Sequence, residues 1–145
     1  LDVLMFVFFR LWDFVSADVA GFYSQVDPES TGDGGDLTIK TDTLRVEGEV
    51  QISSTTRGAG KGGNLTVQAS DVQLIGTSKN DIPTGLFSRT LSAADAGDLT
   101  IKTNTLLLKD LTEVSSGTLD AGKAGNLTIN TNTLRVKPFK LNRLV

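Results

Sequence analysis

One block of about a dozen residues recurs four times in this chain, and this recurrence constrains the fold more than any other feature. Each block begins with the sequence Gly-(Asp/Asn)-Leu-Thr-(Ile/Val). It ends on two apolar residues with one residue between them. The leading glycines, interpreted as the structural turns of the repeat, are Gly35, Gly63, Gly97 and Gly125. Successive blocks are thus 28, 34 and 28 residues apart, which makes a larger unit of 62 residues. A period of this length indicates an architecture of stacked repeats.

Apolar and polar residues alternate within each block, which is the pattern of a half-buried strand. In the first block Leu37, Ile39 and Thr41 share one face. A second short strand is expected at Leu44 and Val46, and a third over residues 50–54. One repeat alone leaves its apolar row exposed, whereas repeats stacked at about 4.8 Å bury it continuously. We therefore predict an all-β fold: a right-handed, single-stranded parallel β-helix (β-solenoid) of about four coils of 28–34 residues, with three short strands in each coil.

The repeats do not cover the whole chain. The expected organisation is an atypical N-terminal cap or fragment end at residues 1–14, β-helix repeats at 15–137 and a frayed C-terminal end at 138–145. Arg10 and Trp12 do not fit the repeat, because small aliphatic residues belong at their positions. An antiparallel up-and-down sheet is the competing fold, but it needs a hairpin turn between successive strands.

The extra length of the 34-residue spacing lies between Leu74 and Ala94, where a surface loop is expected. We expect such a rod to present residues 76–93 and 21–34 to its surroundings as loops, since insertions in a stacked repeat project from its surface.

Stacking would align equivalent residues in columns along the rod. Two positions before the leading glycines, the charge column is Asp33, Lys61, Asp95 and Lys123. Two further columns alternate charged residues with amides: Asp36, Asn64, Asp98 and Asn126, and Lys40, Gln68, Lys102 and Asn130. Like charges about 4.8 Å apart repel by roughly 1 kcal/mol even in a water-like dielectric. The alternation therefore indicates a register that separates like charges, although duplication of the 62-residue unit would produce the same columns.

Composition excludes several kinds of chemistry. The chain has no Cys and no His, so disulfides, thiolates and imidazole bases are absent, and no metal site or cofactor is expected. A net charge of −3 does not favour nucleic acid as a partner. The apolar run Val3–Phe9 is too short for a membrane span and lacks the basic flank of a signal peptide. Gly58, Gly60 and Gly63 match a dinucleotide-binding fingerprint by letter, but a strand and not a helix is expected after them, so we interpret them as turn glycines with positive φ.

Some β-helices are enzymes that cleave polysaccharides, and catalysis there requires acidic and basic side chains converging in one groove. The nearest candidates are Lys109, Asp110 and Glu113 with Arg89. No charged counterparts are identified for Lys109 and Glu113 in the adjacent coil, so a solvated surface is the better interpretation and no catalytic residue is predicted.

The blocks resemble those of filamentous haemagglutinin-like exoproteins of the two-partner secretion type. The resemblance rests on the recurrent Gly-(Asp/Asn)-Leu-Thr-(Ile/Val) phrase, on the third strand at 52–56 and on the Gly-rich return at 58–63. The segments 21–26 and 85–90 also resemble the long-coil loop of this family. The resemblance covers residues 15–137, and both ends are similar to those of a fragment.

The resemblance implies a long secreted fibre on the bacterial cell surface, exported through an outer-membrane secretion partner and active in adhesion, surface coating or biofilm formation. We expect a structural or adhesive segment without catalysis that binds a surface glycan or protein receptor. The alternative is a carbohydrate-binding or carbohydrate-cleaving β-helix protein.

Overall fold

The computed structural model describes residues 4–7, 21–77 and 79–138, and within these ranges the chain forms parallel β-strands and no helix. The strands fall into two sheets. The larger sheet contains, in spatial order, β1 (Leu4–Val7), β3 (Leu37–Glu47), β5 (Leu65–Ile75), β7 (Leu99–Lys109) and β9 (Leu127–Lys137). The smaller sheet contains β2 (Gly21–Val26), β4 (Gln51–Thr56), β6 (Thr84–Thr90) and β8 (Thr112–Thr118).

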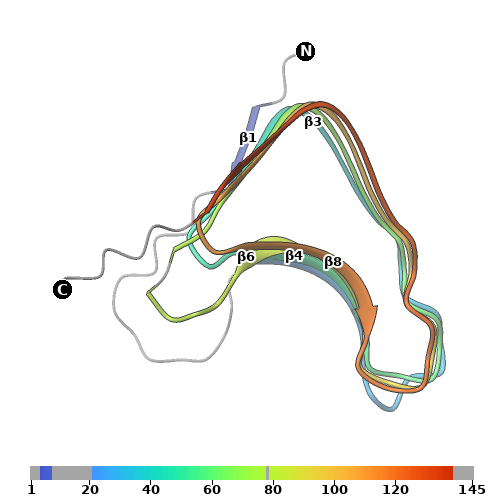
Figure 1. Cartoon of the computed structure of the whole chain (residues 1–145). Helices are drawn as coiled ribbons and strands as arrows, with labels where there is room; N and C mark the ends of the chain where they lie inside the picture. Colours follow the sequence, from blue (N-terminus) through green and yellow to red (C-terminus); the bar gives the residue numbers. More distant parts are fainter. Residues whose placement is uncertain (1–3, 8–20, 78, 139–145) are drawn as a thin grey trace.

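The chain passes alternately from one sheet to the other, and each strand pairs with the equivalent strand of the next repeat. Leu37 pairs with Leu65, Leu65 with Leu99 and Leu99 with Leu127, so the repeats stack in register. Figure 1 looks along the stack, where the strands of each sheet lie behind one another around a three-sided outline. This winding is consistent with a β-solenoid.

The first two strands expected in each repeat form one continuous strand of 11 residues, so a repeat contributes two strands and not three. A corner interrupts the long strand in its middle. The ladder between β3 and β5 runs to Thr41↔Ala69 and resumes at Thr43↔Asp71, without a pair at Asp42. The alternation also shifts there, because the buried residues continue at Leu44 and Val46 and not at position 43. The backbone stays extended around the corner, and for this reason no turn separates the two predicted strands.

The core lies between the two sheets, and it contains the residues of the long strands predicted to point inward together with residues of the smaller sheet. Its centre is fully buried and includes Leu44, Leu65, Val72, Leu99 and Ile101. Ile52 and Leu86 reach it from the smaller sheet. Fully burying a side chain of this size contributes about 1.5–3 kcal/mol, so the stacked apolar rows are the main stabilising feature of the fold.

The expected loops at 76–93 and 21–34 are only partly loops. β6 lies inside the first range, its side chains are almost all buried, and it pairs with β4 and β8. β2 lies inside the second range and pairs with β4. The six extra residues of the long spacing fall before β6, in the segment 76–83 that projects from the stack in Figure 1. The prediction was wrong for residues 84–90 and 21–26, because these residues pair with strands of neighbouring coils and the extra length is confined to the segment before β6.

Part of the predicted N-terminal cap continues the stack, since β1 pairs in parallel with residues 43–46 of β3. The rest of the range 1–14, including Arg10 and Trp12, lies outside the described residues, as do residues 139–145 of the predicted frayed end.

Candidate functional site

The four leading glycines form a column in which the backbones of successive coils approach closely. A Cβ atom at Gly63, Gly97 or Gly125 would lie 2.2, 2.1 or 2.0 Å from the carbonyl oxygen of the preceding glycine of the column. The corresponding position at Gly35 is open, with Ser24 Oγ at 3.5 Å as the nearest atom. Among the described glycines only Gly48 has positive φ, so the expectation of positive φ at 58, 60 and 63 is wrong. Close packing between coils is the reason for glycine at these turns.

The acidic and amide residues after these glycines form a ladder of hydrogen bonds along the stack. The carboxylate of Asp36 accepts the backbone N–H of Asn64 at 2.8 Å. The Asn64 side-chain oxygen accepts the N–H of Asp98, and the Asp98 carboxylate accepts the N–H of Asn126. Asp and Asn are equivalent in this role because each offers a side-chain oxygen. The column thus satisfies turn N–H groups that the sheets leave unpaired.

The aspartates of the charge column form hydrogen bonds to the backbone, a contact that the prediction from charge alternation did not include. The structure brings its members together in consecutive coils: Asp33 accepts the N–H of Lys61, and Asp95 accepts the N–H of Lys123, both at 2.8 Å. The described residues form three ion pairs, and none of them joins two members of this column. A lysine side chain has no hydrogen-bond acceptor. The aspartates alone therefore accept the backbone N–H of the next residue in the column.

A serine column in the smaller sheet, which the sequence interpretation missed, faces the glycine column. Ser88 donates to the Gly97 carbonyl at 2.7 Å, and Ser24 donates to that of Gly35 at the same distance. Ser116 also reaches the Gly97 carbonyl, at 3.3 Å. The fourth hydroxyl, that of Ser54, is buried without a hydrogen-bond partner among the described residues. The signal that could have revealed this column is Ser at the same position of all four strands.

Threonines of the long strands satisfy the backbone at the corner. Thr103 donates to the carbonyls of Ser70 and Thr105, and Thr131 donates to those of Asn104 and Thr133. The Ser70 and Asn104 carbonyls belong to the corner positions where the ladder is interrupted. The repeated Thr-x-Thr sequence is therefore explained by its backbone contacts.

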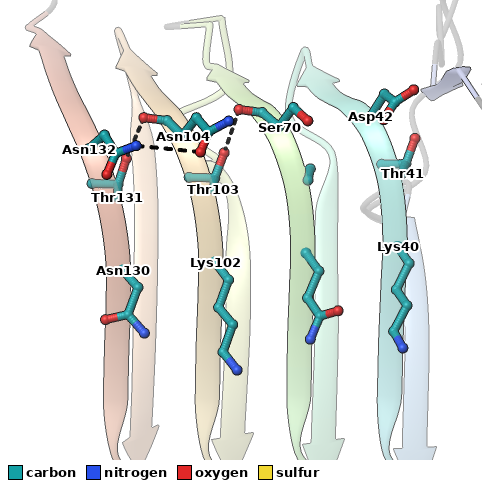
Figure 2. A pocket seen from close by; sticks show the side chains of 12 residues that line it. Lys40, Thr41, Asp42, Ser70, Lys102, Thr103, Asn104, Asn130, Thr131 and Asn132 are labelled. Carbon is teal, nitrogen blue, oxygen red and sulfur yellow. Dashed lines mark hydrogen bonds between the residues drawn. The ribbon is translucent and has the colours of Figure 1, made fainter.

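A hollow of about 980 Å³ runs across the outside of β3, β5, β7 and β9 beside this corner, and we call it the corner groove. One rim is the predicted column Lys40, Gln68, Lys102 and Asn130, and the other is Asp42, Ser70, Asn104 and Asn132. Figure 2 shows both rows with the threonines between them. The sequence identified the first row as a charge pattern, but the bend that creates the hollow was not recognisable in it.

The first rim of the corner groove has no internal partners. None of its four side chains forms a hydrogen bond or an ion pair with another described residue. Beyond the corner, a second outward row of the long strands begins with Arg45 and Gln73. Arg45 pairs with Glu47 at 2.9 Å and donates to Gln73 at 2.6 Å. The unpaired donors of the first rim therefore lie beside the hollow, whereas in the other row Arg45 is paired and Arg135 forms no ion pair with another described residue.

The candidates considered for catalysis lie in two places: Arg89 and Glu113 belong to β6 and β8 of the smaller sheet, whereas Lys109 ends β7 of the larger sheet and Asp110 follows it. The Arg89 guanidinium lies 3.7 Å from the centre of the Phe87 ring and pairs with the Glu113 carboxylate at 3.0 Å. Ser115 donates to the same carboxylate. Lys109 pairs with its neighbour Asp110 at 3.7 Å, so the four candidates form two ion pairs. Each carboxylate thus has a cation as its partner.

The projecting segment 76–83 is attached to the stack by one carboxylate. Glu49 accepts hydrogen bonds from the Thr77 hydroxyl and from the backbone and side-chain N–H groups of Asn80. Its own N–H donates to Thr84 at 2.8 Å, and its φ is 58°, a conformation unusual for a residue with a side chain. This network holds the inserted segment before β6.

No group of three or more side chains suited to hold a metal ion occurs in the described part of the chain. Within the same part, no helix is long and apolar enough to cross a membrane. Comparisons with protein-family models, curated proteins and solved structures found no match for this chain.

Proposed function

We propose that this chain is a structural and adhesive segment of a secreted bacterial exoprotein of the filamentous haemagglutinin-like type. Its role is that of a stiff rod at the cell surface, without catalysis. The observation that carries the proposal is the in-register parallel pairing of equivalent residues from repeat to repeat. A stack of this kind can be extended in one direction by adding coils, which suits a fibre better than a closed domain does.

The finer architecture that we propose is a right-handed β-helix of about four coils of 28–34 residues. Parallel strands joined by a crossover within one sheet are right-handed in about 98% of cases, which supports this hand. The glycine and Asp/Asn columns support a continuous stack, because each brings residues of one coil against the next coil.

Export through an outer-membrane secretion partner and a location at the cell surface follow from the family resemblance. The receptor class that we expect is a surface glycan or protein. Carbohydrate cleavage is the alternative function, and measuring reducing-sugar release from anionic polysaccharides separates it from a binding or structural role. The Arg89→Gln variant serves as a control, since it removes the cation that faces Glu113.

The first test is a thermal melt of the purified chain followed by far-UV circular dichroism, with limited proteolysis alongside. A β-type spectrum, one cooperative transition and resistance of the core strands to protease are the expected results. A disordered chain that is digested completely at low protease concentration would contradict the rod proposal. Cleavage confined to the segment 76–83 would agree with it, because this segment projects from the stack.

A further inference from the structure

We propose that the corner groove binds a linear acidic polysaccharide whose carboxylates recur on alternate sugar units. This inference rests on the proposed function, since it names the receptor class of the adhesive rod. The groove crosses four strands and follows the stacking direction, so its long axis matches a polymer and not a compact ligand. An extended chain of pyranose units would lie along the two rims.

The charge pattern of the first rim decides between glycan types. Lys40 and Lys102 are separated by the Gln68 strand, so their backbones are about 9.6 Å apart, twice the spacing of adjacent strands. A sugar ring in an extended chain is about as long as one strand spacing, so carboxylates on alternate sugars can face the two lysines. Gln68 and Asn130 would then donate to hydroxyl or amide groups of the sugars between them.

The partners within the protein support the same conclusion. The donors of this rim are unpaired within the described residues, as are other exposed cations such as Lys61, Lys123 and Arg135, and what distinguishes the rim is the hollow that it borders across four strands. The threonines of the groove direct their hydroxyls to the backbone, so the rims supply the groups that contact the ligand. The opposite rim holds one carboxylate, Asp42, at one end, which leaves the centre of the groove with a positive charge at Lys102.

Nucleic acid is a different polyanion, and the structure does not favour it. It carries a charge on every unit, whereas the rim alternates a cation with an amide.

The test is calorimetric titration of the full chain with a hyaluronan octasaccharide, which carries a uronate on every second sugar. The comparison ligands are a chitin oligosaccharide without carboxylates and a single-stranded oligonucleotide. The K40Q/K102Q variant is expected to raise the Kd for the hyaluronan octasaccharide by about tenfold or more, because two exposed charge contacts are lost. The matched control K61Q/K123Q removes two exposed lysines with the same alternate spacing from another column, and we expect its Kd to stay within about twofold.

Several outcomes would overturn the inference. Equal weakening by the two double variants would mean that only general charge attracts the polymer. Tighter binding of the oligonucleotide or of the uncharged oligosaccharide would exclude the proposed ligand class. Absence of binding by a chain that melts cooperatively would reject the groove as a glycan site and leave the rod proposal intact. A chain without a cooperative melt would reject both proposals, and circular dichroism of each variant distinguishes loss of contact from loss of fold.

Discussion

β7 and β9 have nearly the same sequence, Leu-Thr-Ile-Lys-Thr-Asn-Thr-Leu-Leu-Leu-Lys and Leu-Thr-Ile-Asn-Thr-Asn-Thr-Leu-Arg-Val-Lys, yet their environments differ. Leu99 and Ile101 of β7 are 0% exposed, whereas Leu127 and Ile129 of β9 are 45% and 37% exposed. β7 pairs on both sides, with β5 and β9, whereas β9 pairs with β7. The same local pattern therefore produces the same strand and register, and the position in the stack decides how much surface the strand buries.

The comparison also indicates how much each coil of a stacked fold contributes to the free energy of unfolding. Each inner coil is covered by two neighbours, so its contribution includes two interfaces, while an end coil contributes one. Stability should therefore depend on position more than on sequence for equivalent residues of the repeat.

The largest effect is expected for core truncation in the two strands. Ile101→Ala should lower the free energy of unfolding by about 2–5 kcal/mol, because it leaves a cavity between two covered coils. Ile129→Ala should lower it by less than about 1 kcal/mol, because the side chain is already partly in water. Urea denaturation followed by circular dichroism measures both values. Equal losses would contradict the difference in burial.

A second pair of variants tests how closely the coils approach. Gly97→Ala should destabilise the fold by about 2 kcal/mol or more, because the new methyl group meets the Gly63 carbonyl oxygen. Gly35→Ala should change the free energy of unfolding by less than about 0.5 kcal/mol, because the space there is open. Chemical denaturation of the two variants provides the comparison, and a tolerated methyl group at position 97 would show that the coils lie farther apart.

The serine column allows a subtler comparison. Ser88→Ala should cost about 1–2 kcal/mol, since it removes a hydrogen bond to the Gly97 carbonyl in a buried site. Ser54→Ala should be neutral or slightly stabilising, because the hydroxyl it removes is buried without a partner. The midpoints of thermal unfolding should separate the two variants, and a larger loss at position 54 would mean that its hydroxyl has a partner.

The smallest effect is expected in the charge column. Lys61→Asp places a carboxylate between Asp33 and Asp95 and should cost a few tenths to about 1 kcal/mol. Lys123→Asp should cost less, because it adds one acidic neighbour and not two. The difference between the two melting temperatures should shrink at high salt, where exposed charges are screened. Identical melting temperatures at low salt would remove the electrostatic part of the column interpretation.

Much of the fold could be predicted from the sequence. The period-2 alternation correctly identified the inward residues Leu37, Ile39, Leu44 and Val46, and the recurring blocks indicated which strands pair. The missed features are those that depend on two coils at once. The corner at Asp42 hid the continuity of the long strand, and the extra length of the long spacing led to a loop being expected where β6 lies.

The candidate site also has one part that could be predicted from the sequence and one part that could not. The column of Lys40, Gln68 and Lys102 follows from counting positions along the repeat, because strands in register align equivalent residues. The hollow beside it follows from the bend of the long strands, which only the packed sheets determine. The absence of internal partners for its lysines is likewise a property of the folded surface.

The sequence by itself determined the repeated segments that form the larger sheet, their register and their inward faces, because alternation and repetition are properties of the chain that do not depend on its neighbours. Only the tertiary structure decided which copies are buried, why the turn glycines are needed and where polar groups remain unpaired. The physical reason is that burial, backbone approach and hydrogen bonding between coils each require a neighbouring coil. Nearly identical sequences in the middle and at the end of the described stack have two such neighbours and one, respectively.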